Sequence, residues 1–211
     1  IEKDFLGEKQ IPADAYYGVQ TQRGKDNFHI TGTPMSSEPY FVMAFGYVKK
    51  AAAMANRDLG VLDGRVADAI IAACDRLIAG EMRDQFITDF IQGGAGTSTN
   101  MNANEVIANI ALEAMGHDKG EYQYLHPNND VNMAQSTNDA YPTAIRLGLL
   151  LGHDALLASL DSLIQAFAAK GKVAPCTATL PTQQRAIKLV RTGRKRGQPA
   201  IYRKLAQAHD G

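Results

Sequence analysis

The sequence predicts a mainly α-helical protein: a small N-terminal helical domain with a short β hairpin, followed by the first long helix of a central helical bundle. Three observations support this fold class. Apolar residues recur at helical spacing in several segments, glycines follow these segments, and a long apolar stretch begins near Pro142. We divide the chain into an N-terminal helical domain (1–140), the start of the bundle (141–172) and a basic tail (173–211).

The first 59 residues are expected to form loops and then a helix. Residues 1–34 are rich in glycine, proline and short alternating pieces, which predicts loops with a hairpin around Ile11–Val19. A first helix follows from about Glu38 to Leu59. Lys49 and Lys50 are assigned to its solvent-exposed side.

Two further helices complete the N-terminal domain. One runs from about Asp63 to Ile78, with apolar residues at helical spacing and Gly80 at its end. The other runs from about Asn102 to Ala114, and Asn102 with Glu105 fits a capping box at its start, so we expect Glu105 to be structural.

A long helix is expected from about Pro142 to Lys170. At 1.5 Å per residue it would extend roughly 40 Å, and its apolar residues spread around more than one face. A three-helix domain is too small to cover so wide an apolar surface. We therefore favour a rod that enters a bundle shared between subunits over a helix packed within its own chain.

Two polar clusters precede helices and are the candidate functional residues. The stretch HPNNDVNMAQSTND (126–139) is dense in amide and hydroxyl side chains, and Asn138 or Asp139 would cap the helix that follows, with Pro142 in its first turn. The stretch GGAGTSTNMNANEV (93–106) repeats this design. Helix N-termini carry unpaired N–H groups and a partial positive charge, so both clusters suit an anion such as a carboxylate or phosphate. Polar residues before a helix are also ordinary loops and caps.

These motifs resemble the aspartase/fumarase superfamily. The segments GTSTNMNANEVIANIA and QSTNDAYPTAIR resemble two of its signature regions, and DFLGEKQIPADAYYGVQTQR, KKAAAMAN and GHDKGEYQYL are similar to bacterial aspartases. The paired motifs cover about residues 1–172 and are far more specific than one short pattern. STND in place of SSND and AGTSTN in place of SGTQSN favour an aspartase over a fumarase, a hydratase on the same scaffold.

The resemblance implies an enzyme that reversibly eliminates ammonia from L-aspartate to give fumarate through a carbanion intermediate. It assigns Thr97, Ser136 and Thr137 to the substrate β-carboxylate and Asn138 to its amino group. Neutral donors aimed at the β-carboxylate would stabilise the charge that develops there when the carbon-bound proton is removed. The resemblance also implies a cytoplasmic homotetramer with active sites built from three subunits. It implies no cofactor, apart from an activating divalent cation such as Mg²⁺.

The resemblance stops after Lys172. It places the catalytic base, a serine on a mobile loop, beyond residue 211, so we expect no catalytic residue within this chain. A threonine motif expected after the long helix is replaced by an unrelated sequence, with Gln183 near the position of the threonine. The usual Pro-Asn-Asp-His run is PNND at residues 127–130, which weakens the case for a second anion site near His126.

Composition excludes several classes of protein. The formal net charge is zero, but residues 173–211 hold eight lysines and arginines and one acid, so the remainder holds 14 basic and 21 acidic residues. The basic tail suggests an alternative, a non-catalytic protein that binds nucleic acid, but the tail lacks a recognised motif.

Cys74 and Cys176 are too far apart in sequence to suggest a metal or disulfide framework. We expect neither a signal peptide nor a membrane span.

Overall fold

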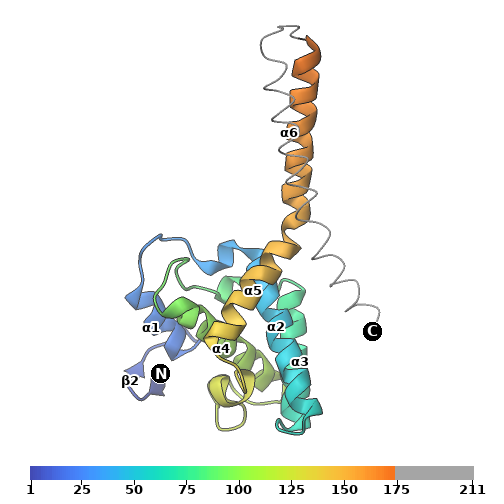
Figure 1. Cartoon of the computed structure of the whole chain (residues 1–211). Helices are drawn as coiled ribbons and strands as arrows, with labels where there is room; N and C mark the ends of the chain where they lie inside the picture. The colour runs from blue at the N-terminus through green and yellow to red at the C-terminus, as the bar shows by residue number, and fades with distance from the viewer. Residues whose placement is uncertain (174–211) are drawn as a thin grey trace. The chain divides into compact units, whose positions relative to one another are not determined.

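The computed structural model describes residues 1–173 (Figure 1). Ile1–Leu151 form one compact unit, and the helix after Gly152 belongs to a second. The elements in chain order are β1 (Glu2–Asp4), β2 (Gly7–Lys9), α1 (Val19–Asn27), η1 (Met35–Ser37), α2 (Pro39–Asp58), α3 (Gly64–Ile78), η2 (Arg83–Gln85), η3 (Gly94–Gly96), α4 (Thr97–Ala114), η4 (Pro127–Val131), α5 (Thr137–Leu151) and α6 (His153–Val173). The expected mainly α fold with one short hairpin is confirmed. The division of the chain at residues 140 and 172, and its basic tail, stay predictions; Cys176 and Gln183 lie outside the described residues.

The hairpin lies earlier in the chain than the sequence suggested. β1 and β2 pair antiparallel, with Asp4 opposite Gly7 at the turn. The Asp4 side chain accepts a hydrogen bond from the Leu6 N–H at 2.9 Å, and Gly7 has a φ of +114°. Residues 11–19 instead form a loop that leads into α1, so the prediction of a hairpin there was wrong. An aspartate and a glycine at either end of a tight turn were the better signal.

Helix α1 was not predicted, because its N-terminus is capped from distant parts of the chain. Gly18 precedes it and has no side chain to act as a cap. The Glu105 carboxylate of α4 accepts hydrogen bonds from the N–H groups of Gly18, Gln20 and Thr21 at 2.8, 2.9 and 3.0 Å. Glu2 accepts the N–H of Val19 at 2.8 Å. The carboxylates of Glu105 and Glu2 therefore cap α1 in place of a side chain at its own N-terminus.

The core of the first unit forms where α4 packs against α3 and α3 packs against α2. In Figure 1, α2 and α3 run alongside each other, and α5 lies against α2. From Asn102 to Leu112 every residue of α4 is buried, as expected for the central helix of a small domain. The predicted ends of α2 and α3 are confirmed, because Gly60 and Gly80 follow them with φ of +69° and +92°.

Helix α4 begins five residues earlier than expected. It starts at Thr97, so Asn102 and Glu105 lie inside it and the predicted capping box is wrong. The Asn102 side chain instead accepts the N–H of Ile87 at 3.1 Å and donates to the carbonyl of Gln85 at 2.9 Å. Glu105 is structural, as predicted, but it serves α1 and not its own helix.

The predicted long helix is divided at Gly152. α5 ends at Leu151 and α6 begins at His153, and glycine is a poor helix former that permits such a break. α5 begins at Thr137, which places Pro142 in its second turn and not in its first. Because proline has no N–H, the carbonyl oxygen of Asn138 lacks the usual helical donor four residues ahead.

No single helix among residues 1–173 is both long enough and apolar enough to cross a membrane. α5 and α6 meet that criterion only when they are taken together as a broken pair.

Candidate functional site

The first polar turn is built on glycines that adopt left-handed backbone conformations. Gly94 and Gly96 have φ of +67° and +90°, and Ala95 between them has a φ of +51°. Thr97 then opens α4, and its Oγ1 donates to the Gly94 carbonyl at 2.5 Å. The Thr97 side chain is exposed. This predicted site residue therefore stands on the surface at a helix N-terminus, where backbone N–H groups favour an anion.

The residues that follow Thr97 are held inside the protein. The Thr99 N–H donates to Oε1 of Gln92 at 2.8 Å, and Thr99 is fully buried against Thr88. Ser98 packs against Gly24 of α1, where an added Cβ would lie 2.9 Å from the Ser98 Cβ. Thr99 and Ser98 thus position the turn, and Thr97 is the threonine that it presents.

The second polar turn carries its own cap. Ser136 precedes α5, and its Oγ accepts the N–H of Asn138 at 3.2 Å. In return, its N–H donates to Oδ2 of Asp139 at 3.2 Å, which completes a capping box with an aspartate as the acidic partner. The prediction of Asn138 or Asp139 as the cap was therefore wrong. Ser136 and Asn138 are exposed and Thr137 is half-buried, so all three stand near the surface.

The fold brings these two turns together. Gly96 packs against the ring of Tyr141 so closely that an added Cβ would lie 2.3 Å from a ring carbon. Asn100 of α4 donates from Nδ2 to Oγ1 of Thr137 at 3.4 Å. The N-termini of α4 and α5 are thus in direct contact, although 40 residues separate them in sequence. Thr97 and the 136–138 turn flank this contact.

A buried lysine supports the second turn. Lys49 was expected to be exposed, but it has no exposed surface, and its Nζ donates to Oδ1 of Asn132 at 2.9 Å and to Oε1 of Gln135 at 3.0 Å. The side of α2 that carries Lys49 faces the turn before α5, and that packing cannot be deduced from the pattern of α2 alone. Lys50, the next residue, is half-buried and pairs with Asp75 at 2.6 Å.

Burial alters the proton affinity of Lys49 and of its neighbour Cys74. Loss of hydration lowers the pKa of Lys49 to about 7, and a weaker interaction with Cys74 acts in the opposite direction. Burial raises the pKa of the Cys74 thiol to about 12. Cys74 is therefore a neutral thiol near neutral pH, and Lys49 is the residue of this pair that can change charge in that range.

The site offers neutral donors backed by positive potential. Hydroxyl and amide groups come from Thr97, Ser136, Thr137 and Asn138, and the N-termini of α4 and α5, which carry partial positive charge, are in contact there. Lys49 adds a positive charge beneath the turn when it is protonated. Within the described part of the chain, no three His, Cys, Asp or Glu side chains are grouped so that they could hold a metal ion. The arrangement suits a small anion.

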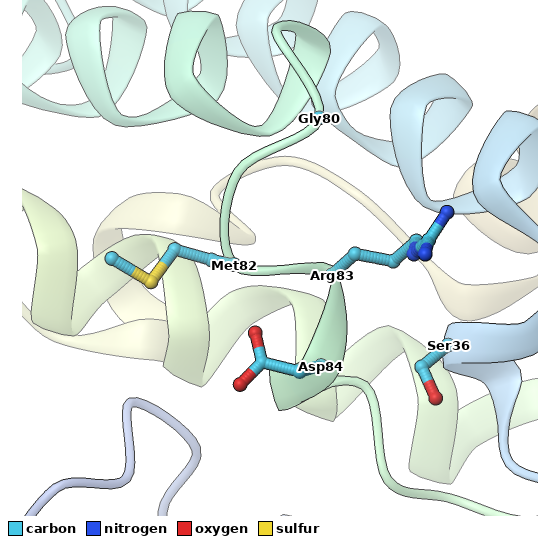
Figure 2. Close-up of a pocket in the computed structure, with 5 residues that line it drawn as sticks. All are labelled: Ser36, Gly80, Met82, Arg83 and Asp84. Atoms are coloured by element: carbon cyan, nitrogen blue, oxygen red, sulfur yellow. The ribbon is translucent and has the colours of Figure 1, made fainter.

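A surface pocket and the side chain of His126 contribute less to the candidate site. A pocket of about 440 Å³ is lined by Ser36, Gly80, Met82, Arg83 and Asp84, but Figure 2 shows that the Met82 and Arg83 side chains point in opposite directions, so the lining groups do not converge. His126 accepts the N–H groups of Asn128 and Asn129 on Nδ1 at 3.0 and 3.3 Å. Its ring nitrogen therefore caps the turn that follows it, which agrees with the weak case for an anion site near His126.

Comparison with known proteins agrees with these motifs. A family described as lyase matches residues 7–176. The chain is 72% identical over 171 residues to an aspartate ammonia-lyase of Pseudomonas aeruginosa, and 54% identical over 171 residues to one of Escherichia coli. Each of these matches covers 81% of this chain and 36% of the relative.

Solved structures give the same result. A fumarate lyase:delta crystallin from Brucella melitensis superimposes with a TM-score of 0.77 at 54% identity, over 81% of this chain and 38% of that one. A class II fumarase from Schistosoma mansoni gives a TM-score of 0.72 at 35% identity, over 80% and 36%. The chain thus spans little more than a third of the length of these relatives. The resemblance predicted from the two polar motifs is confirmed, and the chain belongs to the lyase family that includes the aspartate ammonia-lyases.

Proposed function

We propose that this chain forms the substrate-carboxylate-binding part of an aspartate ammonia-lyase, which reversibly eliminates ammonia from L-aspartate to give fumarate. The observation that carries the proposal is the contact between the two polar turns at Gly96–Tyr141 and Asn100–Thr137. It supports one shared anion site, and the 72% identity to an aspartate ammonia-lyase supports L-aspartate as the ligand.

In this proposal Thr97, Ser136 and Thr137 bind the β-carboxylate and Asn138 binds the amino group. Removal of the proton next to the β-carboxylate places a second negative charge on its oxygens. Hydroxyl and backbone N–H donors at these helix N-termini interact more strongly with that dianion than with the substrate, which lowers the barrier. To donate its hydroxyl hydrogen to the ligand, Thr97 must exchange its bond to the Gly94 carbonyl for one to the carboxylate. We expect the catalytic serine beyond residue 211, and we propose no cofactor other than an activating divalent cation such as Mg²⁺.

Binding of a diacid tests this assignment without requiring turnover. We expect the 211-residue chain to bind succinate and fumarate in calorimetric titrations. Thr137→Val should weaken binding about fivefold or more, because it removes one hydrogen bond to the anion. Thr143→Val is the matched control: Thr143 lies on the same helix, is exposed, and donates its hydroxyl hydrogen to the Asp139 carbonyl at 2.6 Å. Equal affinities for the two variants would contradict the assignment.

Fumarate hydratase is the alternative activity, favoured by the similarity to the class II fumarase. The two reactions differ in the nucleophile that adds to fumarate. Loss of the fumarate absorbance only when ammonia is present supports the ammonia-lyase. Loss in buffer alone supports the hydratase. This assay applies to the chain together with the remaining parts of the enzyme.

We also propose that the chain assembles as a cytoplasmic homotetramer through α5 and α6. Ile145 and Leu149 of α5 are 38% and 72% exposed, and Leu156 and Leu163 of α6 are 58% and 45% exposed. Exposed apolar surface of this kind on helices is typical of an oligomer interface. Sedimentation velocity should give a species of four chains, and Leu156→Glu should dissociate it. A monomer at all concentrations would contradict this assembly.

A further inference from the structure

The hydrogen bonds beneath the second turn form a continuous chain whose direction is set at one end. Lys49 can only donate when it is protonated, so both of its partners must accept from it. Oδ1 of Asn132 and Oε1 of Gln135 therefore face Nζ, at 2.9 and 3.0 Å. The opposite ends of these amides agree: Nδ2 of Asn132 donates to the Gln135 carbonyl at 3.0 Å, and Nε2 of Gln135 donates to the Val131 carbonyl at 3.0 Å.

The orientation of Asn132 determines that of Asn100. Oδ1 of Asn132 also accepts from Nδ2 of Asn100 at 3.1 Å. If the Asn100 amide were turned over, two oxygens would face each other. The orientation that Asn100 adopts is costly, because its Oδ1 is buried without a hydrogen-bond partner among the described residues. A buried oxygen is left unpaired so that Nδ2 points toward Asn132 and Thr137.

Asn100 in turn determines what Thr137 can do. A threonine hydroxyl has one hydrogen to donate and two lone pairs to accept. Because Oγ1 of Thr137 accepts from Nδ2 of Asn100 at 3.4 Å, its own hydrogen is free to point toward another acceptor. Thr137 stands in the turn that we assign to the β-carboxylate, so that acceptor is a ligand oxygen.

We propose that Lys49 is a positioning residue that, through Asn132 and Asn100, makes the Thr137 hydroxyl a hydrogen-bond donor toward a bound carboxylate. This inference rests on the proposed function and deepens it. Lys49 does not touch the ligand. Its ammonium group instead imposes one direction on three successive hydrogen bonds that end at the site.

The charge state of Lys49 should therefore change the affinity of the site for a diacid. The pKa of Lys49 lies near 7, and Cys74 of α3 is the titratable group that interacts with it, while the turn presents neutral amides. A neutral amine has a lone pair and can accept, so Oδ1 of Asn132 loses its charged donor, and the orientation of this amide is then held less firmly, by the bond from Nδ2 to the Gln135 carbonyl. Diacid affinity should fall as the pH rises from 6.5 to 9.

The test compares Lys49→Met with Lys50→Met, a substitution of the neighbouring half-buried lysine that pairs with Asp75. Side-chain amide signals of Asn100 and Asn132 are followed by ¹⁵N NMR in the full 211-residue chain, and circular dichroism confirms folding. In the unsubstituted chain both signals should titrate with the Lys49 midpoint. Lys49→Met should move both signals and abolish the titration, whereas Lys50→Met should leave them unchanged. Asn100 signals that are unaffected by Lys49→Met would overturn the proposal.

Succinate titration supplies the second measurement, because its carboxylates stay ionised over this pH range. Lys49→Met should weaken binding about three- to tenfold and make it independent of pH from 6.5 to 9. The double variant Lys49→Met/Thr137→Val should bind no more weakly than Thr137→Val alone. Additive losses would mean that Lys49 acts otherwise than through Thr137, and would overturn the proposal. If the unsubstituted chain binds no succinate, the proposed function fails, and the NMR comparison still decides whether Lys49 orients Asn100.

Discussion

The contact between Gly96 and Tyr141 joins the two polar turns, and Gly96→Ala tests how much this contact contributes. Gly96 has a φ of +90°, so an alanine there costs about 1–2 kcal/mol in backbone strain alone. Its Cβ would also lie 2.3 Å from the Tyr141 ring, far inside van der Waals contact. Overpacking of this kind costs about 1–3 kcal/mol more. We therefore expect a total loss of about 2–5 kcal/mol in the free energy of unfolding.

Gly80→Ala is the matched control for the strain. Gly80 has a φ of +92°, and no atom lies within 4 Å of an added Cβ, so only the cost of about 1–2 kcal/mol applies. The difference between the two variants, about 1–3 kcal/mol, measures the contact with Tyr141. Urea unfolding followed by circular dichroism measures both, provided that the slopes of the transitions agree.

A second substitution, Tyr141→Ala, removes the ring and completes a double-mutant cycle with Gly96→Ala. In a Tyr141→Ala background, Gly96→Ala should cost no more than Gly80→Ala, because only the strain remains. Succinate binding should be weakened by Gly96→Ala and unchanged by Gly80→Ala. A difference of less than about 0.5 kcal/mol between Gly96→Ala and Gly80→Ala would refute the reasoning, because the turns would then tolerate separation.

Three further predictions concern the groups that hold the first unit together. Glu105→Gln should lower the free energy of unfolding by about 2–4 kcal/mol, because an amide side chain cannot accept from the N–H groups of Gly18, Gln20 and Thr21 and from the Thr21 hydroxyl together. The control is Glu113→Gln, at an exposed site on the same helix, which should cost under about 0.5 kcal/mol in the same unfolding experiment. Burial opposes ionisation of Asp89, but hydrogen bonds from Ile91, Thr31 and Gly32 prevail and lower its pKa to about 2. The stability that this carboxylate provides is therefore present above pH 4 and lost as the pH falls toward 2, and Asp89→Asn should flatten that part of an acid titration monitored by circular dichroism, whereas an unchanged profile would contradict it. The Cys74 thiol, whose pKa burial raises to about 12, should resist iodoacetamide at pH 8 until urea unfolds the chain; peptide mass spectrometry that finds it alkylated in the folded protein would show that the core opens.

Local sequence was sufficient for the features whose causes are local. Helix α3 was predicted because its apolar residues repeat at helical spacing, Asp63 caps it by accepting the N–H of Arg65 at 2.9 Å, and Gly80 takes the left-handed conformation after it. The two polar turns were also identified from sequence, because their hydroxyl and amide residues lie within a few positions of a helix start, although the residues that cap the two helices were assigned wrongly. The family followed from the same motifs.

Other features depended on partners far away in the chain. α1 has no local cap, and the carboxylate that completes its N-terminus comes from Glu105, 84 to 87 residues away. Lys49 was assigned to the surface, since a lysine on an amphipathic helix usually faces solvent. It is buried because the turn before α5, 83 residues later, supplies the amide oxygens that Lys49 needs.

The sequence by itself thus determined which turns carry donors and which helices they begin. Only the tertiary structure decided that the two turns meet, through Gly96 and Tyr141, and that a buried ammonium group lies beneath them. The physical reason is that propensity and capping act over a few residues, whereas the pairing of a buried polar group depends on whichever distant segment the fold places beside it.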